Sequence, residues 1–263
     1  MAGSILEGAL PKAIIGEIHC DSGRACRYGM FARHGGASGE PYTSLNVGVY
    51  VGDDPEAVAV NRQRVRQALD IPRLLTARQV HGRGVYCLTE PIGSDLEVDG
   101  FDALVTNLPG IGLAIQQADC QAVLLLDPRR EVIAAIHCGW RGSVLGLVPE
   151  VVAVMTGNYG TEASDLRAII SPSLGPCCAE FVNYRSELPV DFQQFMVSDT
   201  SFDFWQITKA QLSAAGVAEA HIETTGRCTC CSDDYFSYRR ATRQNSGITG
   251  RNCSVIALER KSS

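Results

Sequence analysis

The feature that most constrains the fold of this chain is a series of short apolar segments between residues 76 and 138, each with the length and composition of a β-strand. The segments are TARQVH (76–81), GVYCLT (84–89), DALVT (102–106), IGLAIQQ (111–117), CQAVLLLD (120–127) and EVIAAIHC (131–138). Turn signals such as DPRRE lie between them, and the short spacings favour hairpins at several joints. The middle of the chain is therefore predicted to be dominated by β-structure.

The segments on either side add helices to this strand-rich centre. Helices are predicted at 55–70, 143–158, 187–197 and 205–215, and further strands at 13–20, 29–33, 164–171, 221–225 and 253–259. Asp54 and Pro55 favour the start of the first helix, and Pro149 is expected near a kink or in the first turn of the second. Strand runs mixed with helices predict an α+β fold in a single domain over residues 1–263.

Composition limits the class of protein. The net charge of -6 and the sequence pI of about 5.4 argue against a general nucleic-acid binder, which needs a basic surface. No segment approaches the roughly 18 apolar residues of a membrane span, and the first residues lack the pattern of a secretory signal. We therefore expect a cytoplasmic protein that binds neither membranes nor nucleic acid. Most of its eleven cysteines should then be free thiols, and a few could be metal ligands.

Reactive side chains lie at the ends of three of the predicted strands. They are His81 in QVHG (79–82), Cys120 in QQADC (116–120) and His137 in HCGWRG (137–142). If these strand ends meet, two imidazoles and one thiolate suit zinc and leave a fourth position for water or substrate. Asp119, beside Cys120, could then orient a ligand or carry a proton.

Simpler explanations exist for each of these residues. A single histidine at a strand end usually has a structural hydrogen bond, and Cys120 and Cys138 could be inert core thiols. The cysteines at 228, 230 and 231 lack the second pair that would complete a zinc site, which favours a structural or incidental role. The vicinal pair Cys177–Cys178, after a Gly-Pro turn, is interpreted as structural.

Taken together, the motifs resemble the YfiH family of purine nucleoside phosphorylases, formerly described as laccase-domain or multicopper polyphenol oxidase-like proteins. The matching motifs, in order, are QVHG, DG with DALVT, ADC, HCGWRG, LGPCC, CT-C-C…FSYRR and TGR, within residues 27–256. The resemblance implies layered mixed β-sheets flanked by helices, a fold related to cysteine hydrolases. It also implies a zinc ion bound by His81, Cys120 and His137. Cys138 stands where many relatives have alanine.

The resemblance further implies phosphorolysis of adenosine, inosine and methylthioadenosine, together with adenosine deamination. In our working hypothesis, zinc activates the water that attacks the purine C6, while phosphate attacks the ribose in the other reaction. Arg33 and Arg141 are candidates for binding phosphate, because a guanidinium group can form paired hydrogen bonds to it. His34 and Asn46 are further candidates for the substrate pocket.

Other interpretations remain open. Cys120 and His137 could form a metal-free dyad that cleaves an amide, and a bacterial branch of the family is linked to editing of cell-wall precursors. Copper could occupy the same ligands as zinc. The five histidines of the chain cannot supply the trinuclear cluster and the blue-copper site of a multicopper oxidase. A closed structural zinc site would need a fourth ligand such as Cys138. A monomer or a small homo-oligomer is expected.

Overall fold

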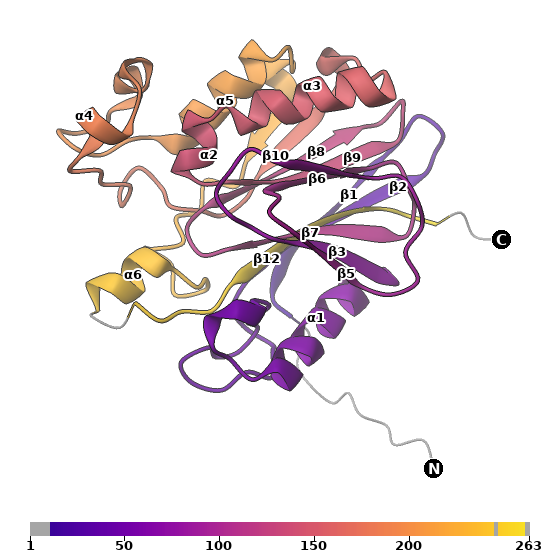
Figure 1. The fold of residues 1–263 in the computed structure, drawn as a ribbon, viewed down its shortest axis with the longest axis horizontal. Coiled ribbons are helices and arrows are strands. Elements are labelled where there is room, and N and C mark those ends of the chain that lie inside the picture. Colours follow the sequence, from indigo (N-terminus) through magenta and orange to yellow (C-terminus); the bar gives the residue numbers. More distant parts are fainter. Residues whose placement is uncertain (1–10, 245–246, 261–263) are drawn as a thin grey trace.

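The computed structural model describes residues 11–244 and 247–260, which fold into two packed β-sheets with helices on both outer surfaces (Figure 1). Residues 1–10, the start of the chain that is expected not to form a secretory signal, lie outside the described residues. Within the described part of the chain, no helix combines the length and apolar character needed to cross a membrane.

Each sheet has six strands and contains both parallel and antiparallel pairs. The first sheet, in spatial order, consists of β1 (Ala13–His19), β2 (Ala25–Phe31), β12 (Asn252–Leu258), β7 (Ile111–Gln117), β3 (Arg73–Arg78) and β5 (Leu96–Asp99). The second consists of β11 (Ile222–Thr224), β10 (Arg167–Ile170), β8 (Gln121–Asp127), β9 (Val132–Cys138), β6 (Ala103–Thr106) and β4 (Val85–Leu88). The predicted α+β fold with layered mixed sheets is confirmed.

Apolar side chains fill the spaces between these layers. Leu75 and Leu113 of the first sheet pack between the sheets with Leu124 of the second, and all three are almost fully buried. On the outer surfaces, α1 (Pro55–Leu69) covers the first sheet, while α3 (Leu147–Tyr159) and α5 (Phe204–Ala214) cover the second (Figure 1). The remaining α-helices are α2 (Trp140–Val144), α4 (Tyr184–Glu187) and α6 (Tyr238–Arg243). Strands β8 and β9 are buried along their whole length because both of their faces are covered.

Local sequence signals explain which helix predictions succeed. Asp54 caps α1 by accepting a hydrogen bond from the Glu56 N–H, as the sequence predicts. Pro149 falls in the first turn of α3, where a missing N–H costs little. The helix predicted at 187–197 is present only in part, and not as an α-helix. Pro189 forces an extended backbone on Leu188, so α4 ends at Glu187 and only a 3₁₀ helix, Val190–Phe195, follows.

The chain crosses from the first sheet to the second at three joints: β3 to β4, β5 to β6 and β7 to β8. The hairpin predicted between β8 and β9 is confirmed, because these neighbours pair antiparallel. The joint between β7 and β8 is not a hairpin, since the two strands belong to different sheets. Residues His81, Asp102 and Cys120 lie at or beside these three crossings.

Candidate active site

The crossings bring the three predicted metal ligands together. The ligand atoms of His81, Cys120 and His137 all lie within 4.8 Å of one another. Nε2 of His81 is 3.9 Å from Sγ of Cys120, and the two imidazole rings meet edge to face. His81 is exposed, whereas His137, near the end of β9, is 3% exposed. These three residues, called the ligand group below, are therefore buried on the His137 side and open to solvent on the His81 side.

Asp102 is the carboxylate that organises this group. Its Oδ1 lies 2.8 Å from Nδ1 of His137, which leaves the Nε2 atom of that ring for the ligand cluster. The same carboxylate accepts hydrogen bonds from the backbone N–H groups of Val80, His81 and Gly82 at 2.7–3.2 Å. Asp102 therefore orients one imidazole directly and fixes the backbone that carries the other.

Charges in the group reinforce one another. Burial opposes ionisation of the Cys120 thiol, but the charge and hydrogen bonds of His137 and His81 outweigh it and lower its pKa from 9.0 to about 6. Burial lowers the pKa of His137, yet Cys120 and Asp102 together raise it to about 9. For Asp102, burial raises the pKa, but hydrogen bonds from His137 and the backbone hold it below its usual value of 3.8. The arrangement favours a thiolate at Cys120.

Two residues at the crossings have an unfavourable backbone conformation. His81 has φ 58° and Asp119 has φ 90°, a region that side chains other than glycine rarely adopt. Such strain concentrates at functional sites, where surrounding contacts maintain it. Here the three hydrogen bonds to Asp102 hold the His81 loop.

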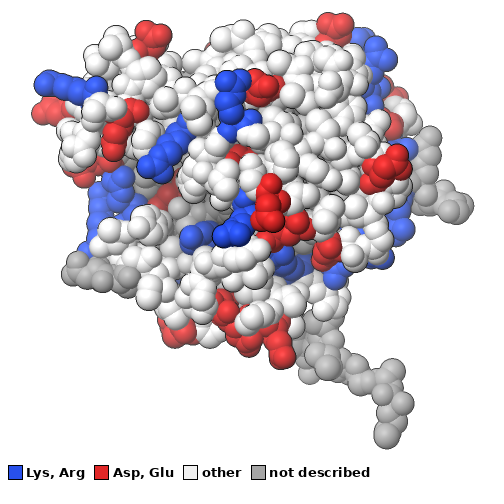
Figure 2. Space-filling model, viewed as in Figure 1, with Lys and Arg blue, Asp and Glu red and all other residues white. Residues whose placement is uncertain are grey.

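The ligand group opens into a cavity of about 630 Å³, within the range of small-molecule sites. Aromatic and cationic side chains line it together with the ligand group; they include Tyr50, Trp140, Phe181, Phe204 and Tyr238, and Arg78, Arg141, Arg239 and Arg251. Figure 2 shows Lys and Arg side chains around a hollow on the side of the molecule where α2 and α6 lie. The cavity thus combines flat apolar faces with positive charge.

Of the other predicted site residues, Arg141 and Asp119 line the cavity. The Arg141 guanidinium lies 4.7 Å from the centre of the Trp140 ring and is exposed. The Asp119 carboxylate accepts hydrogen bonds from the Thr229 hydroxyl at 2.7 Å and the Arg239 backbone N–H at 2.6 Å. Neither hydrogen bond involves the imidazole of His81 or His137. Both hold the segment around Thr229 and Arg239 against the loop that carries Asp119 and Cys120.

Arg33, His34 and Asn46 are not among the cavity-lining residues of the described chain. Arg33 donates to the Thr43 carbonyl oxygen and stacks on a phenylalanine ring, and His34 lies 3.2 Å from a carboxylate oxygen of Asp234. Asn46 is fully buried, and its side-chain oxygen accepts a hydrogen bond from the Arg251 N–H at 2.8 Å. Among Arg33, His34 and Asn46, only Asn46 is hydrogen-bonded here to a residue that lines the cavity, namely Arg251.

Sequence analysis missed Asp102 and Arg251. Both lie within motifs of the family resemblance, DALVT and TGR, but neither was given a role. A carboxylate directly before an apolar strand was the available signal for Asp102. For Arg251 the signal was an arginine next to a glycine turn just before the last strand.

Cys138 does not belong to the ligand group. Its side chain packs in the core between the second sheet and α3, and its Sγ lies 3.3 Å from the Ser143 hydroxyl. Burial raises the pKa of this thiol to about 11. This placement disfavours Cys138 as a fourth ligand that would close the site.

Known proteins resemble this chain in sequence and fold. A family model described as "Multi-copper polyphenol oxidoreductase laccase" matches residues 27–259. The purine nucleoside phosphorylase YlmD of Geobacillus stearothermophilus is 32% identical, over 87% of this chain and 88% of that protein. The purine nucleoside phosphorylase ORF3 of Streptomyces griseus is 38% identical, over 79% and 86% of the two chains.

Solved structures agree with this match. The crystal structure of Bacillus licheniformis hypothetical protein YfiH aligns with a TM-score of 0.80 at 28% identity, over 89% of this chain and 93% of that one. The structure of YlmD aligns with the same TM-score at 31% identity, over 89% and 92%. The family model, the relatives and the solved structures agree. The chain therefore belongs to the YfiH family, which the matching family model describes as laccase-type proteins.

Proposed function

We propose that this protein is a zinc-dependent purine nucleoside phosphorylase acting on adenosine, inosine and methylthioadenosine. The observation that carries the proposal is the shared cavity. A group competent to bind a metal, several aromatic faces and several arginines all line one space. The names of the relatives support the same reaction class.

The donor set fits zinc. Two imidazoles and one thiolate are common zinc ligands, and the Asp102–His137 contact is the outer-shell hydrogen bond that accompanies such sites. Copper could bind the same atoms. When bound, the ion would supply a Lewis acid able to lower the pKa of water, which is the chemistry that the proposed second activity, adenosine deamination, needs.

The residues of the chain would bind and orient the two substrates. Aromatic faces such as Trp140, Phe181 and Tyr238 suit the flat purine ring. Phosphate would attack C1′ of the ribose, forming a C1′–O bond as the C1′–N9 bond to the base breaks. Positive charge beside C1′ would hold the phosphate for this attack and keep its oxygens aligned with the ribose.

Arg251 is the strongest candidate for holding phosphate. Burial lowers its pKa, although the negative charges of Cys120 and Asp119 counteract this effect. Among the described residues it forms no ion pair with a carboxylate, and its guanidinium donates to the carbonyl oxygens of Thr249 and Gly250. A phosphate would supply the anion that this half-buried guanidinium lacks. Arg141 would add a second, more exposed charge, and Asn46 would position Arg251.

The test is a phosphate-dependent assay on purified protein with measured zinc content. Wild type, Cys120→Ala and Cys87→Ala are compared, the last being a half-buried thiol of β4 outside the cavity lining. We expect free base and ribose 1-phosphate only when phosphate is present, in wild type and Cys87→Ala. Absence of turnover of every purine nucleoside at full zinc occupancy would overturn the proposal.

A second candidate is a metal-free amidase that uses Cys120 as nucleophile and His137 as its partner. The observation that favours it is the close approach of the Cys120 thiol to the His137 imidazole, whose ligand atoms lie within 4.8 Å of each other. The charge and hydrogen bond of His137 help to lower the pKa of Cys120 to about 6. This candidate predicts amide cleavage, for example of cell-wall precursors, in chelator-treated protein and its loss after thiol alkylation. Nucleoside turnover that disappears with the metal would exclude it. In either case we propose a cytoplasmic location, because Cys120 must stay reduced.

A further inference from the structure

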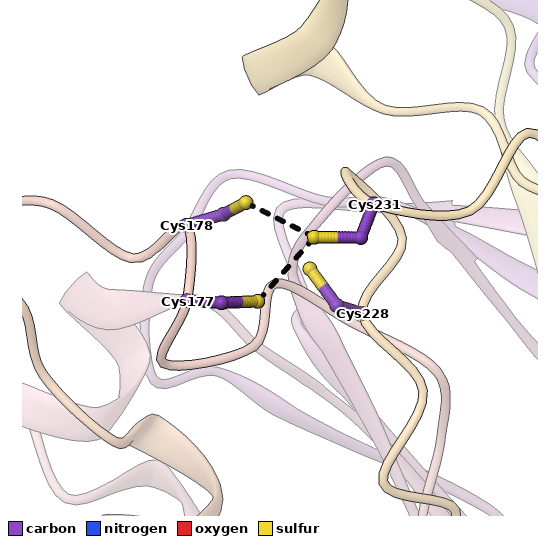
Figure 3. Close-up of side chains that lie close together, drawn as sticks. All are labelled: Cys177, Cys178, Cys228 and Cys231. Carbon is purple, nitrogen blue, oxygen red and sulfur yellow. Dashed lines mark hydrogen bonds between the residues drawn. The ribbon is translucent and has the colours of Figure 1, made fainter.

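Four cysteines from two distant loops meet at the surface of the protein (Figure 3). Cys177 and Cys178 lie in the segment before α4, and Cys228 and Cys231 lie between β11 and α6. The Sγ atom of Cys231 is 3.4 Å from that of Cys177 and 3.5 Å from that of Cys178, and the four sulfurs all lie within 4.8 Å of one another. Cys228 and Cys231 have no second cysteine pair in their own segment. Cys177 and Cys178, about fifty residues earlier in the chain, supply that pair in space.

These separations suit one bound ion better than a disulfide. Sulfur atoms around a tetrahedral zinc with Zn–S bonds of about 2.3 Å are about 3.8 Å apart, whereas a disulfide places them at about 2.05 Å. Cys231 approaches two different sulfurs at nearly equal distance, and a disulfide can use only one of them. The C-x-x-C spacing of Cys228 and Cys231 is also that of zinc knuckles.

The surroundings are suited to thiolates. The backbone N–H of Gly175 donates to Sγ of Cys228 at 3.3 Å. The guanidinium of Arg243 lies 4.0 Å from Sγ of Cys178 and would offset part of the negative charge of a four-thiolate site. Cys178 is buried while Cys177 and Cys231 are exposed, so an ion can enter from solvent and still be partly shielded.

We propose that Cys177, Cys178, Cys228 and Cys231 form a structural zinc site, separate from the candidate catalytic group. Four protein ligands close such a site to substrate, so its role is to fasten two loops. Backbone hydrogen bonds between Ser173 and the segment 227–229 already join the loops beside the cluster. Leu174 and Phe181 of the first segment, and Tyr238 and Arg239 after the second, line the cavity. The proposed ion therefore holds two parts of the cavity wall in register.

The test is the zinc content per chain, measured by plasma mass spectrometry on protein purified under reducing conditions. We expect two zinc ions in wild type, one in Cys228→Ser/Cys231→Ser, and one in Cys120→Ala. Cys230→Ser is the matched control, because this thiol lies in the same run but outside the four-sulfur group, and it should keep both ions. The double variant should also melt several degrees lower than the control.

A measurement on wild type keeps the proposal falsifiable if the double variant does not fold. X-ray absorption at the zinc edge should show an excess of sulfur neighbours over the nitrogen-rich average that one His₂Cys site alone would give. One zinc per chain with four freely alkylated thiols would overturn the proposal. So would an intact mass about 2 Da low, which reports a disulfide, or iron in place of zinc.

Discussion

Nδ1 of His137 lies 2.8 Å from Oδ1 of Asp102, and the two side chains are 3% and 0% exposed. Since the carboxylate also holds three backbone N–H groups around His81, one residue sets the geometry of both imidazoles. Changes at Asp102 should therefore affect metal binding more than changes at any other residue that is not itself a ligand.

Asp102→Asn should lower zinc affinity roughly 10- to 100-fold, because the amide cannot accept the same hydrogen bonds or stabilise the ligand imidazole. Competition with a chromogenic chelator measures this. Asp127→Asn is the control, since Asp127 is equally buried but binds the N–H groups of Arg129 and Arg130 away from the site. Equal zinc affinity in wild type and Asp102→Asn would contradict the assigned role.

Gly139→Ala should disturb the ligand group by direct collision. A Cβ atom at this position would lie 2.9 Å from Sγ of Cys120 and 3.4 Å from the His81 ring. Overpacking of this kind typically costs about 1–3 kcal/mol, here at the expense of metal affinity. Gly142→Ala is the control, because its nearest contacts are ordinary ones at 3.6 Å or more. Zinc titration measures the zinc affinity of both variants, and we expect a loss only in Gly139→Ala. Wild-type affinity in Gly139→Ala would show that Cys120 can move away from the added Cβ atom.

Arg251→Gln should raise the KM for phosphate by about tenfold or more, since a hydrogen bond to a charged group contributes about 1.5–3 kcal/mol. Arg251→Lys should recover part of the loss by restoring the charge without the paired hydrogen bonds. Arg33→Gln is the comparison, because Arg33 lies outside the cavity lining. Initial rates measured over a series of phosphate concentrations give the KM for phosphate of each of the three variants. A larger effect from Arg33 than from Arg251 would reverse the assignment.

Glu97 should contribute to stability in a pH-dependent way. Burial raises its pKa, but hydrogen bonds from Arg62, Tyr50 and Thr76 lower it overall from 4.5. Because the folded-state pKa is below the unfolded one, the contribution is complete above pH 4.5 and is lost as the pH falls through the folded-state value. Urea unfolding of wild type and Glu97→Gln should differ most near neutral pH and converge in acid.

The exposed loop carboxylate Glu90 provides the control for this experiment. Glu90→Gln should follow the wild-type free energy of unfolding across the whole pH range. A constant difference between wild type and Glu97→Gln down to strongly acid pH would mean that packing, and not the charge on Glu97, accounts for the change.

Local patterns predicted much of this molecule, while contacts between distant segments limited the rest. Most of the strands, α1 and the meeting of His81, Cys120 and His137 follow from apolar runs, caps and family motifs, whereas the short strand β5 (Leu96–Asp99) was not predicted. Adjacency in sequence favoured Asp119 as the partner of the ligands, but the contact belongs to Asp102, which arrives from another crossing between the sheets. No single-segment pattern contains that information.

The same limit explains the remaining differences. The pairing of Cys177 and Cys178 with Cys228 and Cys231 depends on two loops that lie side by side although they are about fifty residues apart, which no periodicity encodes. Pro189 did carry a local signal, and giving it full weight would have moved the start of the predicted helix at 187–197 past this proline.

The three crossings between the sheets also have a consequence for how the protein is made. His81, Asp102 and Cys120 each lie where the chain leaves one sheet for the other, so none of them reaches its place until both sheets have formed and docked. A nascent chain with only one finished sheet would therefore lack the proposed metal site. Under the proposed function, the metal would be taken up late in biogenesis, and a bound ion would mark a chain whose assembly is complete.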